Sequence, residues 1–352
     1  MNASQSRNLK LFVALFFLML LFVELVCFGF YKLNPGAIFD WRYYPSAFDH
    51  TKRSNLPFGW TSPEGLPRPD ETKQLPPCAR VFGDSFTYGE EVYPKDAWPN
   101  LASQELGCRI ENYGVGGFGT DQAYILYQST QSNTPIVMLG IYSEMLRRNL
   151  AASWLFYGMQ KDRALKPYFK LTQQGNLEQI TWPANDSAEE YRNYHRHDSF
   201  FKSYDMEFPY FWHMSKTIFY HLKTRLENKG VLFDKHAAAL PLQLALLDAF
   251  KAQANARGSE MVLVFYPSIL ELTKNDLSYR SQMNAYKAKY PQACVIDVGP
   301  ALLDAVKKGT VVAAQSLHYS PSGNAIVATE VVKGLNECPS TKMLIRKEIN
   351  HR

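Results

Sequence analysis

Residues 79–90 read ARVFGDSFTYGE and join a short apolar run to a glycine turn that carries one serine. The run Ala79–Phe82 ends at Gly83, and an apolar run bounded by a turn residue is typical of a strand. Ser85 then follows the carboxyl end of that strand, where sites form in open parallel sheets. We therefore predict that this stretch places a possible nucleophile at the mouth of a sheet.

Further strand-like runs alternate with helical patterns along the chain. We expect strands at 109–113, 136–139, 261–266 and 294–298, and helices at 96–106, from 120, at 242–256 and at 321–335. This alternation indicates an α/β fold in which a parallel sheet is covered by helices on both faces. Asp96, Thr120 and Ser320 are the expected N-caps of three of these helices, and Pro321 suits the first helical position.

An aromatic-rich insertion, about residues 150–240, interrupts the alternation. Within it, residues 168–171 and 177–180 flank Gln174-Gly175-Asn176, and this arrangement predicts a β-hairpin.

Leu11–Phe30 is an apolar segment of twenty residues with one charge, Glu24. It is long enough to cross a bilayer, and no small-residue cleavage site follows it. We expect an uncleaved signal anchor. Arg7 and Lys10 favour a cytoplasmic leader and a domain on the periplasmic or extracellular face, although Lys32 on the far side weakens this bias.

Two interpretations of Glu24 stay open, a functional group at membrane depth or a carboxyl that is protonated or reaches the interface. The expected organisation is then a leader (1–10), an anchor (11–31), a Pro-rich stalk (32–75) that can pack partly on the domain, the main domain (76–338, with the insertion) and a tail (339–352).

The charge pattern excludes one class of partner. The net charge of +5 is modest, with 38 basic and 33 acidic residues, and the basic residues are dispersed. A phosphate backbone needs a basic stripe, so we expect no nucleic-acid partner. His195 and His197 could suggest a metal site, but nothing near them has ligand spacing, so we expect no metal and no other cofactor.

Four cysteines lie outside the anchor: Cys78, Cys108, Cys294 and Cys338. Three begin predicted strands and the fourth ends a helix that runs away from the serine, so all four map to the opposite edge of the sheet. They form either two disulfides, which suit an oxidising compartment, or free buried thiols. Three pairings are possible.

His318 supplies a base of the right type for Ser85 and is followed by Tyr319-Ser320-Pro321. A serine hydroxyl needs a nearby imidazole to accept its proton as it attacks a carbonyl. Backbone N–H groups at a glycine turn can hold the resulting oxyanion, and residues 114–119 (GVGGFG) form such a turn after the second strand.

These blocks resemble the SGNH, or GDSL-type, serine hydrolase family between about Cys78 and Cys338. The resemblance rests on Gly83-Asp84-Ser85 with Phe86 and Gly89, on residues 112–117 (NYGVGG) with Thr120, and on His318 with Gly323 and Asn324. It implies the flavodoxin-like three-layer α/β/α fold of that family. It further implies that Ser85 is the nucleophile, that His318 is the base, and that the Ser85 and Gly117 amides form an oxyanion hole.

Two departures from the family pattern matter. The family carries an aspartate just before the histidine, whereas Gln315-Ser316-Leu317 precede His318 here. Asp297 or Gln315 are the substitutes we consider. The family also supplies an asparagine to the oxyanion hole, but residues 140–145 read GIYSEM here. Three alternatives stay open: Ser143 takes that place, the hole consists of backbone amides alone, or a polar group from the insertion completes it.

The sequence therefore predicts a membrane-anchored serine esterase that acts on acylated small molecules or glycans, with cell-envelope carbohydrate as one substrate class. Two alternatives remain open. One is a carbohydrate O-acyltransferase that uses the same serine, and the other is a non-catalytic glycan-binding or assembly protein.

Overall fold

The computed structural model describes residues 3–33, 56–62, 64–131, 134–152, 166–180, 190, 193–194, 196–197, 208–227, 239–315 and 317–350. Contacts divide the chain into two units. The first comprises Met1–His50 with Lys202–Gly230, and the second comprises Thr51–Phe201 with Val231–Arg352.

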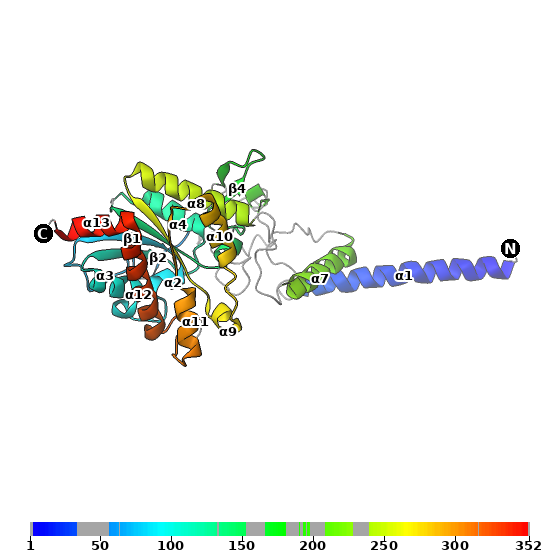
Figure 1. The fold of residues 1–352 in the computed structure, drawn as a ribbon. Coiled ribbons are helices and arrows are strands. Elements are labelled where there is room, and N and C mark those ends of the chain that lie inside the picture. The colour runs from blue at the N-terminus through cyan, green and yellow to red at the C-terminus, as the bar shows by residue number, and fades with distance from the viewer. Residues whose placement is uncertain are drawn as a thin grey trace. The chain divides into compact units, whose positions relative to one another are not determined.

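A five-stranded parallel sheet forms the centre of the second unit (Figure 1). Its strands, in spatial order, are β2 (Arg109–Gly114), β1 (Pro77–Gly83), β3 (Ile136–Ile141), β6 (Glu260–Phe265) and β7 (Cys294–Asp297). The chain first moves outward from β1 to β2 and then crosses to β3, so the strand order reverses between β1 and β3. This is the flavodoxin-like order, and the expected fold class is confirmed.

The strand register aligns the carboxyl ends of the strands. Phe82 of β1 pairs with Tyr113 on one side and with Leu139 on the other, and Phe265 of β6 pairs with Asp297 of β7. Residues that directly follow these strands therefore meet at one edge of the sheet.

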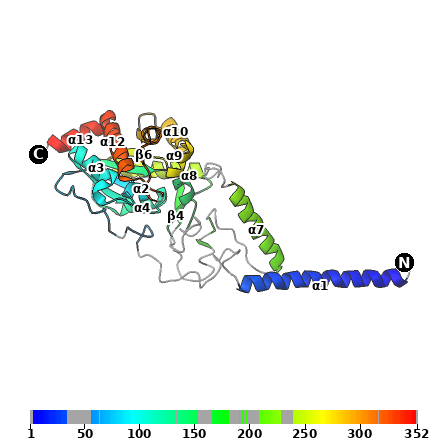
Figure 2. The ribbon, with the colours of Figure 1, turned by 90° about the horizontal axis from the view of Figure 1, so that it is seen from below.

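Helices cover both faces of the sheet, as Figures 1 and 2 show. On one face, α3 (Trp98–Leu106) packs against α12 (Pro321–Glu337), and α12 contacts β7. On the other, α4 (Thr120–Ser129) contacts β1 and packs against α8 (Ala239–Ala256). Every residue of β3 is buried, as expected for a strand covered on both faces.

Shorter elements complete the second unit. They are α2 (Ser85–Tyr88), the 3₁₀ helix η4 (Pro94–Asp96), α5 (Met145–Arg148), β4 (Tyr168–Leu171), β5 (Leu177–Ile180), α9 (Ile269–Lys274), α10 (Arg280–Lys289), α11 (Gly299–Lys307) and α13 (Pro339–Asn350). The antiparallel pair β4–β5 is the predicted hairpin.

The predicted helix starts were right in one case of three. Ser320 caps α12 by accepting from the Gly323 N–H, with Pro321 at the first position. Asp96 instead ends η4, because Pro94 starts a separate turn, and Gly119 rather than Thr120 caps α4.

The folded unit is larger than the predicted domain at both ends. Trp60 and Arg68, assigned to the stalk, bond to the domain, and Ile345 of the predicted tail lies buried in the core.

Two disulfides close the edge of the sheet that lies away from Ser85. Cys78 is bonded to Cys108, joining the starts of β1 and β2, and Cys294 is bonded to Cys338, joining β7 to the end of α12. Of the two alternatives that the sequence left open, two disulfides or free buried thiols, the structure has the disulfides.

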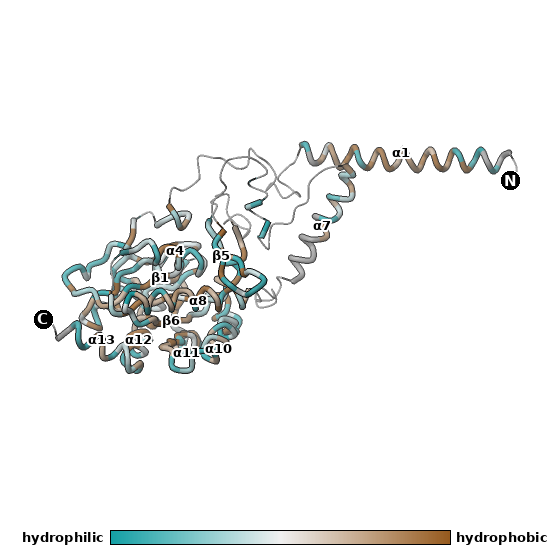
Figure 3. Tube along the Cα trace, turned by 90° about the horizontal axis from the view of Figure 1, so that it is seen from above, coloured by the Kyte–Doolittle hydropathy of each residue, from teal (hydrophilic) through white to brown (hydrophobic). Residues whose placement is uncertain are grey.

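The first unit contains α1 (Ala3–Leu33) and α7 (Tyr210–Glu227), which contact each other. In the described part of the chain, one helix is long and apolar enough to span a membrane, and its apolar segment is Arg7–Phe30. Figure 3 shows this segment as an almost unbroken hydrophobic stretch of α1.

Candidate active site

Ser85 is the first residue of α2, directly after β1. Asp84 caps this helix, its carboxylate accepting from the Phe86 N–H at 3.1 Å, and Gly89 ends it in a left-handed conformation (φ 76°). The end of β2 packs closely on this turn, because a Cβ on Gly114 would lie 2.3 Å from the Tyr88 nitrogen. The second glycine block is therefore brought directly against the serine block.

The backbone N–H groups of Ser85 and Gly117 donate no hydrogen bond within the described residues. Gly117 has φ 81°, a conformation that favours glycine. The turn around it is held by the Trp60 indole N–H, which donates to the Gly116 carbonyl at 2.8 Å, and by the Phe118 N–H, which donates to the Val115 carbonyl at 3.2 Å. Two amide donors of the predicted oxyanion hole are thus unengaged.

His318 lies against the serine block and contacts two carboxylates. Its ring centroid is 5.2 Å from that of Phe86, the residue after Ser85. Its Nδ1 lies 2.8 Å from Glu91 Oε1, and its Nε2 lies 3.5 Å from Glu90 Oε2. A proton on Nδ1 that is donated to Glu91 leaves Nε2 as the basic nitrogen of the neutral ring.

Glu90 links all three sequence blocks. It follows Gly89 at the end of α2, contacts His318, and lies over the glycine turn, since a Cβ on Gly116 would be 3.3 Å from Glu90 Oε2. The serine block, the glycine turn and His318 therefore converge at one edge of the sheet, next to the point between β1 and β3 where the strand order reverses.

Arg68 fixes the loop that carries the two glutamates. Its guanidinium is buried and donates to the carbonyls of Tyr88 and Gly89 on one side of the pair and to that of Val92 on the other, at 2.6–2.9 Å. Glu91 has φ 69°, which is uncommon for a residue other than glycine and is often found at functional sites.

A buried polar cluster lies beneath Ser85. The Asp84 carboxylate accepts from Arg148 Nη1 at 3.2 Å and from the Tyr266 hydroxyl at 3.4 Å. Burial raises the pKa of Asp84 above its ordinary value, and the Arg148 charge opposes this effect without cancelling it. Arg148 also donates to the Phe118 carbonyl at 3.0 Å, so one guanidinium ties the serine block to the glycine turn.

The structure corrects the weaker site predictions. Asp297 is bound to Tyr279, Arg280 and the Gly299 N–H rather than to His318. Gln315 is exposed, and no hydrogen bond joins it to His318 in the described residues. The carboxylate that contacts His318 Nδ1 belongs to Glu91 instead.

Ser143 is likewise engaged elsewhere. Its hydroxyl donates to the buried Glu271 at 2.9 Å. The Asn149 amide bonds to the Asp121 N–H and to Gln243. Neither side chain is available to replace the missing asparagine, whereas the Ser85 and Gly117 amides donate no hydrogen bond to any residue that the structure describes.

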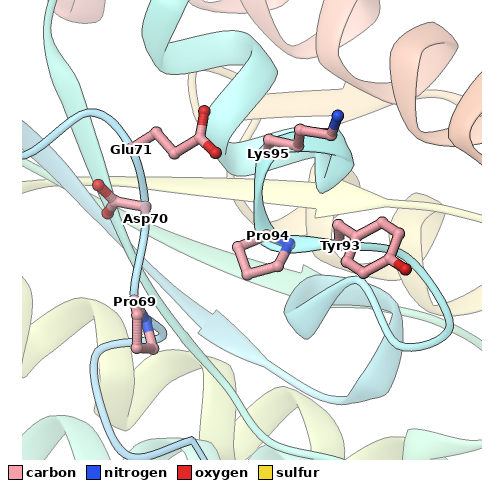
Figure 4. A pocket seen from close by; sticks show the side chains of 6 residues that line it. All are labelled: Pro69, Asp70, Glu71, Tyr93, Pro94 and Lys95. Carbon is pink, nitrogen blue, oxygen red and sulfur yellow. The ribbon is translucent and has the colours of Figure 1, made fainter.

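A surface pocket adjoins the glutamate loop but contains none of the reacting groups. Figure 4 shows it between the segment that follows Arg68 and the segment that follows Val92. Its lining residues are Pro69, Asp70, Glu71, Tyr93, Pro94 and Lys95. Because Ser85, Gly117 and His318 do not line it, we do not assign the ester to this pocket.

Sequence reasoning missed Glu91, Arg68 and the buried Arg148. The signal for Glu91 was present, since two adjacent carboxylates follow Gly89 within six residues of Ser85. It was overlooked because the family pattern directs attention to the residues before the histidine.

No protein-family model matches this chain, and a search of curated proteins found no match. Solved structures do resemble it. A lipolytic protein of the G-D-S-L family from Veillonella parvula is 14% identical, with 72% of this chain and 96% of that chain covered and a TM-score of 0.40. A catalytic mutant of Axe2, an acetylxylan esterase from Geobacillus stearothermophilus, is 13% identical, with 73% and 93% covered and a TM-score of 0.37.

An α/β hydrolase enzyme from the metagenome of Lake Arreo is 12% identical, with 77% of this chain and 97% of that chain covered and a TM-score of 0.41.

Proposed function

We propose that this chain is a serine-dependent ester hydrolase in which Ser85 attacks, His318 transfers the proton and Glu91 orients His318. The observation that carries the proposal is the 2.8 Å contact between His318 Nδ1 and Glu91 Oε1 beside the serine block. A carboxylate at Nδ1 holds the productive tautomer and stabilises the imidazolium that forms during attack.

The reaction follows from these groups. Ser85 Oγ bonds to the ester carbon while its proton passes to His318 Nε2, and the carbonyl oxygen becomes an oxyanion held by the Ser85 and Gly117 amides. Each such donor is worth about 3–4 kcal/mol in the transition state. The imidazolium then protonates the leaving alkoxide, and water, activated by the same nitrogen, releases the acid and restores Ser85.

We propose acyl esters of cell-envelope carbohydrate as the substrate class, with α1 as a signal anchor and the second unit outside the cytoplasm. The apolar segment Arg7–Phe30 and the two disulfides support this location. Polymer-linked esters would be accessible to an enzyme held at that surface.

Turnover of an aryl acetate by the full chain in detergent tests the reaction. The parent and the variant Ser129→Ala, a change at an exposed serine of α4, should both hydrolyse it, while Ser85→Ala and His318→Ala should lose at least about 10³-fold in kcat. Equal turnover by Ser85→Ala and the parent would refute the proposal.

Adding an acetyl-accepting oligosaccharide separates hydrolysis from transfer, since a transferase forms the acylated sugar in preference to free acetate.

A further inference from the structure

Glu24 connects the apolar helix to α7. Its Oε2 accepts from the Tyr210 N–H at 2.6 Å and its Oε1 from the Phe211 N–H at 3.3 Å, so the carboxylate caps the first turn of α7. The rings of Phe28 and Tyr210 pack 5.1 Å apart beside it. The first turn of α7 is therefore fixed to one level along α1.

That level corresponds to a membrane interface if α1 spans the bilayer. Glu24 lies six residues before Phe30, the end of the apolar segment, which corresponds to about 9 Å along the helix axis. Amphipathic helices that lie on membranes are buried by about 5–10 Å at the boundary between headgroups and acyl chains. The two depths agree.

The described part of α7 presents large apolar side chains to solvent. Phe211, Trp212, Ile218 and Phe219 are 49%, 55%, 38% and 70% exposed. The pairs 211/218 and 212/219 are seven residues apart, so they share one side of the helix. The Lys216 ammonium lies 4.9 Å from the centre of the Trp212 ring, and a flexible cation beside an aromatic side chain suits an interface where one end of the residue meets water.

We propose that α7 is an interfacial helix whose Phe211, Trp212, Ile218 and Phe219 side inserts into the outer leaflet beside α1. A lipid surface is the partner because the cap by Glu24 sets the helix at the correct depth. The same cap explains a carboxylate at this level of α1, since two N–H donors and the positive end of a helix dipole stabilise its charge. The proposal rests on α1 spanning the membrane and is independent of the esterase chemistry.

Depth-dependent quenching tests the insertion. The full chain with Cys27→Ser and Phe219→Cys is labelled with NBD, an environment-sensitive fluorophore, and reconstituted in phosphatidylcholine–phosphatidylglycerol vesicles. Lipids with a nitroxide near the headgroup should quench the label at least about twofold, and more than lipids with a nitroxide deep in the acyl chain. The matched control is Met343→Cys on α13, 68% exposed, whose label should not be quenched by either lipid.

Three results would overturn the proposal. An unquenched Phe219→Cys label with the emission of a fluorophore in water would place α7 in solution. An unquenched label with blue-shifted emission would mean that protein, such as a second copy, covers this side. A label at Phe16→Cys, in the middle of the apolar segment, that escapes quenching by the deep nitroxide would remove the spanning helix on which the depth depends.

Discussion

At the residue scale, we propose that Glu91 enables His318 to act as a base. Its carboxylate lies in the loop after α2, far along the sequence from the position just before the histidine where the family pattern has an aspartate. We expect Glu91→Gln to lower kcat/KM for an aryl ester by about 10²–10⁴-fold, because an amide neither stabilises the imidazolium nor enforces the tautomer.

The adjacent glutamate gives the matched control. Glu90→Gln removes a carboxylate 3.5 Å from Nε2 but leaves the Nδ1 contact, so it should retain activity within about tenfold of the parent. If Glu90→Gln is the more damaging of the two changes, the assignment of Glu91 is wrong.

Asp84 and Arg148 give a prediction about stability and pH. Arg148→Met leaves Asp84 buried without its cation, which should lower the free energy of unfolding by about 3–5 kcal/mol at neutral pH. Burial holds the folded-state pKa of Asp84 above that of the unfolded chain, about 3.9, so the protonated form favours folding in acid. This contribution is lost as the pH rises through the folded-state value, and removing Arg148 raises that value further.

The stability deficit of Arg148→Met relative to the parent should therefore be larger at neutral pH than in acid, as measured by urea unfolding. A deficit that is the same under both conditions would show that Asp84 does not depend on Arg148 for its charge.

At the scale of elements, Arg68 links the segment before β1 to the loop that carries Glu90 and Glu91. Arg68→Met should lower kcat by about 10²-fold, because the loss of three backbone contacts allows the Glu90–Glu91 loop to shift, and small misplacements of reacting groups have effects of this size. Arg257 is the control, since it donates to the carbonyls of Tyr127, Gln128 and Thr130 away from the site. Arg257→Met should affect unfolding but not kcat, and equal losses of kcat in both variants would contradict the role of Arg68.

The disulfides stabilise the edge opposite the site. They close loops with sequence separations of 30 and 44 residues, and the chain-entropy model gives about 4 kcal/mol for each. We expect Cys294→Ser with Cys338→Ser to lower the denaturation midpoint accordingly, while Cys27→Ser in the first unit leaves that of the second unit unchanged. An unchanged midpoint in the double variant would show that the Cys294–Cys338 bond does not contribute.

The elements of the sheet could be predicted because each strand is a short buried run followed by a glycine or a polar residue, as in residues 79–83 and 136–140. Parallel topology then determines which edge collects Ser85 and Gly117. The loop of Glu91 could not be found this way, since its position depends on Arg68 contacts across twenty or more residues. Ser143 and Asp297 lie at the carboxyl ends of strands as expected, but Glu271 and Arg280 bind their side chains.

At the scale of the whole molecule, the account describes an enzyme held at a membrane by α1. The full chain should remain with membranes after alkaline carbonate extraction, whereas a chain that begins at Leu33 should be extracted more readily. Equal release of the two chains would refute the anchor.

In membrane vesicles of known orientation, protease should reach the second unit from the non-cytoplasmic side. Cleavage from the cytoplasmic side alone would reverse the proposed topology.

The central claim, that Ser85 is a nucleophile activated by His318 and Glu91, is tested most directly by peptide mapping after reaction with a fluorophosphonate. We predict that the parent carries the adduct on Ser85, that Glu91→Gln reacts more slowly at the same residue, and that His318→Ala does not react. A folded parent that carries no adduct on Ser85, or labelling that is equally fast in His318→Ala, would contradict the account.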